Sequence, residues 1–277
     1  MERTAVGAQA MAAGAAGGQV TRRVSGGDEP RTVWAVPCDC TAEDRGERTF
    51  VRARIPERYR HCDFDNYESD TGIEGASREQ LEIWNRSLAS AKLIVRRFAE
   101  EFTTEGEHGL LLMGPCGVGK THLAVAALKE VVRRGHTGVF YDYRELLKQI
   151  QDSYNPTNQT TEMGVLEPVL KTELLVLDDV GSSKPSPWAL ETVGHVLNTR
   201  YNEKRATILT TNFFDEDSAL AAARPRRALG EREKPPEEPF KERVGQRIRS
   251  RLYEMCRTVE IAAPDYRKMA RDAGFHA

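Results

Sequence analysis

One stretch of sequence decides the fold of this chain: Gly109-Leu110-Leu111-Leu112-Met113-Gly114-Pro115-Cys116-Gly117-Val118-Gly119-Lys120-Thr121. Its apolar first half predicts a short buried strand, and the alanine- and leucine-rich residues that follow it predict a helix. The glycines between them have the spacing G-x-x-x-x-G-K-[ST], in which backbone N–H groups turn inward and hold phosphate oxygens. The alternative, a glycine-rich turn with a chance lysine, does not explain the complete spacing in this context. The stretch therefore predicts a phosphate-binding loop.

The loop predicts a specific role for each of its polar residues. The Lys120 ammonium is expected to reach the β- and γ-phosphates of a nucleotide, and the Thr121 hydroxyl to ligate Mg²⁺. The helix that begins near Gly119 adds the positive end of its dipole. The predicted nucleotide contacts are Gly114, Pro115, Cys116, Gly117, Val118, Gly119, Lys120 and Thr121.

A second part of the site is predicted from acidic and amide side chains at strand ends. The apolar run 174–177 ends in Asp178-Asp179, and the run 207–210 is followed by Thr211 and Asn212. We expect Asp178 to hold Mg²⁺ through its water shell and Asp179 to polarise the attacking water. Asn212 could orient that water or sense the γ-phosphate. The alternatives are a plain turn cap for the aspartates and a simple strand terminator for Asn212.

Composition limits the class of protein. The 277 residues suffice for one large α/β domain and a smaller N-terminal piece. The net charge of −2 does not by itself call for a nucleic-acid partner. Five cysteines, an odd number, favour reduced thiols in the cytosol. No apolar run approaches the roughly 20 residues that a membrane helix needs. The N-terminus also lacks the apolar core of a signal peptide, so we expect a cytoplasmic protein with no membrane partner.

Three regions are expected along the chain. Residues 1–32 are rich in alanine and glycine and predict a disordered tail. Residues 33–76 are expected to form a small N-terminal segment and linker. Residues 77–277 are expected to form the nucleotide-binding domain, with a flexible charged loop at about 216–239. That domain begins with a helix, because Ser77 and Gln80 have capping-box spacing and an apolar stripe follows.

Four N-terminal residues raise the question of a zinc site. Cys38 and Cys40 are followed by His61 and Cys62, and Cys and His are typical zinc ligands. A structural zinc site usually has two closely spaced ligand pairs, and nothing upstream supplies the first Cys-x-x-Cys. A buried free thiol is the ordinary outcome for Cys62.

Basic residues gather near the C-terminal end. The span 224–251 holds ten Lys and Arg against five Asp and Glu, which suggests DNA contacts in this span and, in an assembly, in interior loops. Arg247 and Arg251 lie on a predicted amphipathic helix, followed by a strand predicted at 259–262. These arginines could form a solvated face, contact phosphates, or reach as arginine fingers into a neighbouring subunit.

Together these motifs resemble an AAA+ ATPase, and more narrowly the bacterial replicative-helicase loaders of the DnaC/DnaI type and the transposition helper ATPases of the IstB type. The resemblance covers roughly residues 55–274. Five strands alternating with helices already predict a doubly wound parallel sheet, and the resemblance implies the strand order 5-1-4-3-2 and no C-terminal lid domain. It also implies that Lys120 and Thr121 are Walker A, Asp178 and Asp179 Walker B, and Asn212 sensor 1. Arg251, with Arg247 as second candidate, would act as a finger in trans.

Three functions follow as hypotheses. The first is an ATP-switched loader that oligomerises, binds a DnaB-type replicative DNA helicase and grips single-stranded DNA. The second is a transposition helper that coats duplex DNA and recruits a transposase. The third, a metabolic P-loop kinase, needs a lid and an acceptor pocket for which the sequence offers no signature.

Overall fold

The chain divides into two compact units, Met1–Arg48 and Thr49–Ala277. The computed structural model describes residues 19–21, 32–34, 50–72, 76–104, 109–155, 161–183, 186–215 and 239–267. In the first unit, β1 (Gln19–Thr21) pairs antiparallel with β2 (Thr32–Trp34). The rest of the predicted disordered tail lies outside the described residues, as do Cys38, Cys40 and residues 216–238 of the predicted charged loop.

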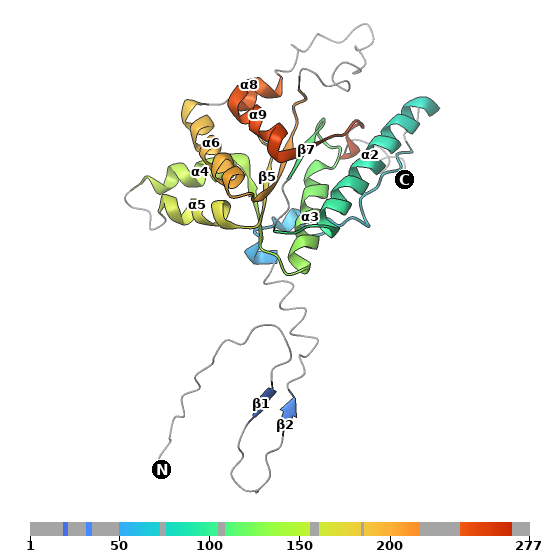
Figure 1. Ribbon diagram of the computed structural model, residues 1–277. Helices are drawn as coiled ribbons and strands as arrows, with labels where there is room; N and C mark the ends of the chain where they lie inside the picture. Colours follow the sequence, from blue (N-terminus) through green and yellow to red (C-terminus); the bar gives the residue numbers. More distant parts are fainter. Residues whose placement is uncertain are drawn as a thin grey trace, which may run out of the picture. The chain divides into compact units, whose positions relative to one another are not determined.

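The second unit is built on a five-stranded parallel sheet (Figure 1). Its strands, in chain order, are β3 (Gly109–Met113), β4 (Gly138–Asp142), β5 (Leu174–Asp178), β6 (Ala206–Thr211) and β7 (Cys256–Glu260). Across the sheet they lie in the order β4-β5-β6-β3-β7. Read from the β7 edge, this is the expected 5-1-4-3-2 order, which is thereby confirmed.

Helices cover both faces of this sheet (Figure 1). They are α2 (Arg78–Glu100), α3 (Lys120–Arg133), α4 (Tyr143–Ser153), α5 (Glu162–Lys171), α6 (Pro187–Asn202), α8 (Phe240–Val244) and α9 (Gln246–Met255), with a short 3-10 helix at Glu57–Tyr59. One core lies between the sheet and α2 and α3, and a second between the sheet and the other helices. In β3, Leu110 and Leu112 point into the first core while Leu111 and Met113 point into the second. Burial on both faces explains the uninterrupted apolar runs of the strands.

The predicted start of α2 is confirmed. Ser77 accepts a hydrogen bond from the Gln80 N–H at 3.2 Å, and the Ser77 N–H donates to Gln80 Oε1 at 3.0 Å. This reciprocal pair is a capping box. Among the described residues, no helix is long and apolar enough to cross a membrane.

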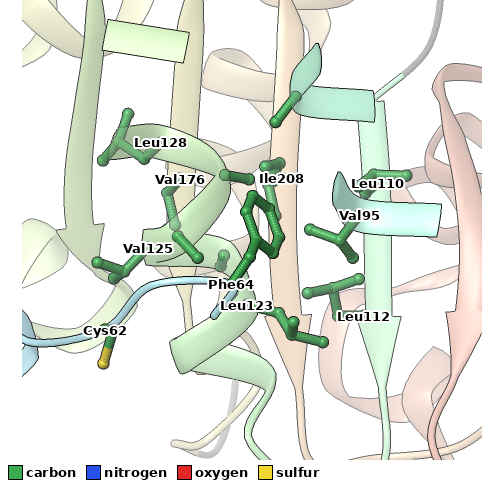
Figure 2. Packing of buried hydrophobic residues seen from close by; sticks show 14 of the residues in the cluster. Cys62, Phe64, Val95, Leu110, Leu112, Leu123, Val125, Leu128, Val176 and Ile208 are labelled. Carbon is green, nitrogen blue, oxygen red and sulfur yellow. The ribbon is translucent and has the colours of Figure 1, made fainter. Parts of the chain in front are cut away.

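The boundary between the two units differs from the sequence prediction. The structure divides the chain after Arg48, not after residue 76. The reason is that residues 50–72 pack onto the first core, where Ile55, Cys62, Phe64 and Tyr67 are buried with α2 and α3. Figure 2 shows Phe64 among side chains of the sheet and α3. Residues that read as a linker are therefore part of the nucleotide-binding unit.

The fifth strand also differs from its prediction. It runs over Cys256–Glu260 rather than 259–262, and begins directly where α9 ends. Among the described strands, β7 lies at the edge of the sheet and pairs with β3 alone, and its residue Arg257 is exposed. Because β7 contains polar residues, it lacks the continuous apolar run by which a central strand is recognised in a sequence.

Candidate nucleotide-binding site

The predicted phosphate loop lies between β3 and α3 at the carboxyl edge of the sheet. Gly117 and Gly119 have φ angles of 83° and 86°, in the left-handed region that favours glycine. A Cβ on Gly119 would lie 2.4 Å from the Tyr67 ring, so the side chain of any other residue would also collide there. The glycines thus allow the turn and the close approach of a neighbouring segment.

Lys120 is buried at the centre of the loop. Its Nζ donates to Gly114 O at 2.9 Å, to Pro115 O at 2.7 Å and to Asn212 Oδ1 at 2.8 Å. Burial lowers the pKa of Lys120 to about 8, because a charged ammonium is poorly solvated there. An anionic ligand beside Lys120 would therefore strongly stabilise the charged form of its ammonium group.

Asp178 ends β5 beside Thr121. The Thr121 hydroxyl donates to Asp178 Oδ1 at 2.9 Å, and the Thr210 hydroxyl donates to the same oxygen at 2.6 Å. Burial raises the pKa of Asp178, while the two hydroxyl bonds act against that rise. A hydroxyl and a carboxylate side by side are the oxygen ligands that Mg²⁺ prefers, so these residues fit the ion.

Asp179 is held in an unusual backbone conformation. Its φ is 58°, and its N–H donates to Thr210 Oγ1 at 2.9 Å. Asn212 Nδ2 donates to Asp179 Oδ1 at 2.6 Å. Left-handed backbone at a residue other than glycine is uncommon and concentrates at functional sites. The fold thus brings Lys120, Asp178, Asp179 and Asn212 together from three strand ends.

These residues line a cleft of about 830 Å³. The cleft is also lined by residues that the sequence analysis did not assign to nucleotide binding, among them Tyr59, His61, Asn66, Tyr67, Tyr266 and Arg267. Most belong to the segment that was read as a linker. The available signal was its density of aromatic and histidine residues, which helical periodicity does not explain.

The segment after β7 closes another side of the loop. The Tyr266 N–H donates to Gly117 O at 3.1 Å, and Asp265 accepts from the Arg267 guanidinium at 3.3 Å. Arg267, whose side chain is largely exposed, lines the cleft beside the loop. The segment that follows β7 thereby places the Arg267 guanidinium in the lining of the cleft.

Arg247 and Arg251 do not reach this cleft within one chain. Arg247 is exposed on α9, and the Arg251 guanidinium lies over the Tyr201 ring at 5.3 Å. Between them, Arg249 binds the buried Asp215 at 2.6 Å and ties α9 to the exit of β6. Neither Arg247 nor Arg251 is therefore part of the cleft lining of its own chain.

Cys62 fits the description of a buried thiol. Burial raises its pKa to about 11, and its nearest polar partner is His61 Nε2, 3.8 Å from Sγ. Within the described part of the chain, no group of three or more His, Cys, Asp or Glu side chains could hold a metal ion. The predicted weak zinc ligands Cys38 and Cys40 lie outside the described residues.

Comparison with known families agrees with this geometry. A family model described as IstB-like ATP binding protein matches residues 78–222, just over half of the chain. The chain belongs to this family. The replicative helicase loader DnaC of Escherichia coli K12 is 27% identical to this IstB-like protein over 167 residues, which cover 60% of this chain and 61% of DnaC. The replicative helicase loader DnaI of Bacillus subtilis 168 is 28% identical over 145 residues, which cover 52% of this chain and 46% of DnaI.

Solved structures also resemble the IstB-like protein. A crystal structure of the DnaC helicase loader covers 75% of this chain and all of its own, with 29% identity and a TM-score of 0.57. A crystal structure of DnaI covers 75% of this chain and 95% of its own, with 21% identity and a TM-score of 0.53. At this identity the match shows the shared fold alone. Along the full-length sequences, the chain spans about three fifths of DnaC and less than half of DnaI.

Proposed function

We propose that this IstB-like protein hydrolyses ATP to ADP and phosphate, and uses that cycle to load a replicative DNA helicase. The observation that carries the ATPase proposal is the contact network among Lys120, Asn212 and Asp179 at the mouth of the cleft. The network places a cation, an amide and a carboxylate where a phosphate loop meets two strand ends. Such an arrangement is typical of P-loop NTPases.

Binding of the triphosphate rests on the loop and its flanking residues. Lys120 exchanges its carbonyl and amide acceptors for β- and γ-phosphate oxygens, which carry full negative charge. Thr121 and Asp178 would hold Mg²⁺, Thr121 as a ligand and Asp178 through the water shell of the ion. Mg²⁺ held there would supply positive charge to the phosphates.

Hydrolysis rests on Asp179 and Asn212. Asp179 accepts a hydrogen bond from the attacking water, and Asn212 orients Asp179 and senses the γ-phosphate. Arg251, with Arg247 as the second candidate, completes the site of a neighbouring subunit in an ATP-dependent oligomer. Action in trans is supported by the cleft lining, because neither Arg247 nor Arg251 lines the cleft of its own chain.

The helicase-loading proposal rests on the relatives, which are named replicative helicase loaders. The expected partners are a DnaB-type helicase and single-stranded DNA, with DNA contacts placed in the basic span 224–251. The alternative function is a transposition helper on duplex DNA, which rests on the resemblance to IstB-type proteins. Both functions use the same ATP site.

Co-elution with the host's replicative helicase separates these alternatives. Purified protein and helicase are run on a sizing column with and without ATP, and Lys120→Ala serves as the variant that cannot bind ATP. An ATP-sensitive complex that Lys120→Ala alters supports the loader. No complex, together with ATP-dependent coating of duplex DNA, contradicts the loader and supports the transposition helper.

A further inference from the structure

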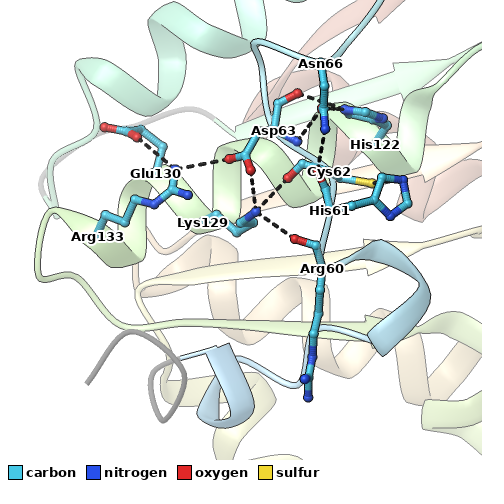
Figure 3. A network of polar contacts seen from close by, with 9 residues as sticks. All are labelled: Arg60, His61, Cys62, Asp63, Asn66, His122, Lys129, Glu130 and Arg133. Atoms are coloured by element: carbon cyan, nitrogen blue, oxygen red, sulfur yellow. Dashed lines mark hydrogen bonds and ion pairs between the residues drawn. The ribbon is translucent and has the colours of Figure 1, made fainter. Parts of the chain in front are cut away.

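Helix α3 holds the segment 60–67 by polar side chains along one of its faces (Figure 3). These side chains are His122, Lys129 and Arg133, and their spacings of seven and four residues place them on one face of a helix. The same helix begins at Lys120, so it carries the phosphate loop at one end and this segment along its side.

Lys129 is the centre of this contact. Its side chain is only 5% exposed, and Nζ donates to Arg60 O at 2.9 Å, to Cys62 O at 3.0 Å and to Asp63 Oδ2 at 2.7 Å. An ammonium has three N–H donors, so each of them has an acceptor. Burying a charge is costly, and only such a complete set of partners offsets the cost. All three acceptors belong to the segment, not to α3.

Two further contacts hold the same segment. Arg133 donates to Asp63 Oδ1 at 3.2 Å. His122 Nε2 lies 2.8 Å from Asp63 O and 2.9 Å from Asn66 Oδ1. Because both of these atoms are acceptors, Nε2 carries the proton. His122 directly follows Thr121, so the segment is held within one residue of the phosphate loop.

The segment held in this way lines the same cleft as the catalytic strand ends. His61, Asn66 and Tyr67 of this segment line the cleft, as does Tyr59 just before it. The Tyr67 hydroxyl donates to Val118 O at 3.0 Å, which fixes the far end of the segment on the phosphate loop. Aromatic and amide side chains are suited to a planar base and to its hydrogen-bonding edge, whereas the loop is suited to phosphate.

We propose that Lys129 is a positioning residue for the base of the nucleotide. It places the 60–67 segment without touching ATP, so it governs base affinity and base selection but not the grip on the triphosphate. The inference rests on the proposed function only in that the cleft binds ATP. It does not depend on hydrolysis or on a helicase partner.

The test compares dissociation constants for ATP, GTP and inorganic tripolyphosphate in the full-length chain carrying Lys129→Met. We expect the ATP Kd to rise about tenfold or more and the ratio of GTP Kd to ATP Kd to approach one, because base contacts are lost. The tripolyphosphate Kd should stay within about twofold. Lys171→Met is the matched control, since Lys171 forms an exposed pair with Glu167 and should leave all three constants unchanged.

A second variant keeps the test decisive if Lys129→Met does not fold. Asp63 is partly exposed, and Asp63→Ala removes one acceptor of Lys129 and the acceptor of Arg133 while leaving both carbonyls that Lys129 contacts. It should raise the ATP Kd, and the effect of the double variant should be smaller than the sum of the two single effects, because Lys129 and Asp63 contact each other.

The inference and the proposed function fail in different ways. Equal weakening of ATP and tripolyphosphate, or an unchanged ATP Kd, would overturn the role of Lys129 while leaving the ATPase proposal intact. A wild-type chain that binds tripolyphosphate but not ATP would contradict both. ATP binding without hydrolysis would contradict only the proposed function.

Discussion

Lys120 Nζ donates a hydrogen bond to Asn212 Oδ1 over 2.8 Å, although 92 residues separate the two in sequence. The other end of the same amide donates to Asp179 Oδ1 at 2.6 Å. The amide is therefore oriented by a cation on one side and a carboxylate on the other. The Asn212 side chain therefore links the position of the Lys120 ammonium to that of the Asp179 carboxylate.

This contact predicts the effect of Asn212→Ala. Lys120 keeps its two carbonyl acceptors, so the ATP Kd should change by no more than about threefold, whereas Asp179 loses its orienting donor and kcat should fall about tenfold to a hundredfold. Equilibrium binding and single-turnover hydrolysis measure the two effects separately. If kcat were unchanged, Asn212 would have no part in the chemistry.

Asp179→Asn should preserve binding and remove turnover. The amide retains the volume of the carboxylate but cannot attract a proton from water, so hydrolysis should fall by a factor of about 10² to 10⁴. Quenched-flow measurement at saturating ATP gives the rate, and a filter-binding titration gives the Kd. Wild-type hydrolysis by this variant would remove Asp179 from the mechanism.

ATP affinity should depend on pH through Lys120. Its pKa is lowered to about 8 by burial, and bound phosphates favour the ammonium, so the bound pKa is higher. Below about pH 8 the affinity should be nearly constant. Above it, binding must take up a proton, and the Kd should rise by up to about tenfold per pH unit. Titrations at constant free Mg²⁺ across this range test it; a flat profile would contradict it.

Arg251→Ala should act only in the assembled protein. The ATP Kd should stay within about twofold, because Arg251 does not line its own cleft, while hydrolysis by the oligomer should fall about a thousandfold. Mixing Arg251→Ala with Lys120→Ala chains should restore part of the activity, since each supplies what the other lacks. Arg247→Ala is the matched comparison on the same helix. No recovery on mixing would argue against action in trans.

Arg200 is predicted to stabilise the fold far from the cleft. This fully buried guanidinium binds neutral oxygens of Val169, Thr172, Glu173, Ala206 and Thr207. Arg200→Met leaves several buried carbonyls without a donor, and should lower the free energy of unfolding by about 3–5 kcal/mol. Urea denaturation measures the loss. Arg97→Met, in an exposed pair with Glu101, should cost under about 1 kcal/mol.

The sequence alone was enough to predict the nucleotide loop, the parallel sheet and the Asp178-Asp179 strand end. The strand, the glycine spacing and the helix that form the loop are consecutive, so each is stabilised by neighbours in the chain. The capping box of α2 is local in the same way. The strand order was available only through the resemblance to AAA+ ATPases.

Only the tertiary structure decided how distant residues meet. The contact of Lys120 with Asn212, the packing of residues 50–72 on the core and the burial of Lys129 and Arg200 all join groups far apart along the chain. Local periodicity records whether a residue faces a core but not which partner it meets there. From sequence, a lysine or arginine in a helix is predicted to be exposed. Its side chain can be buried only when packing brings oxygen atoms to all of its N–H donors.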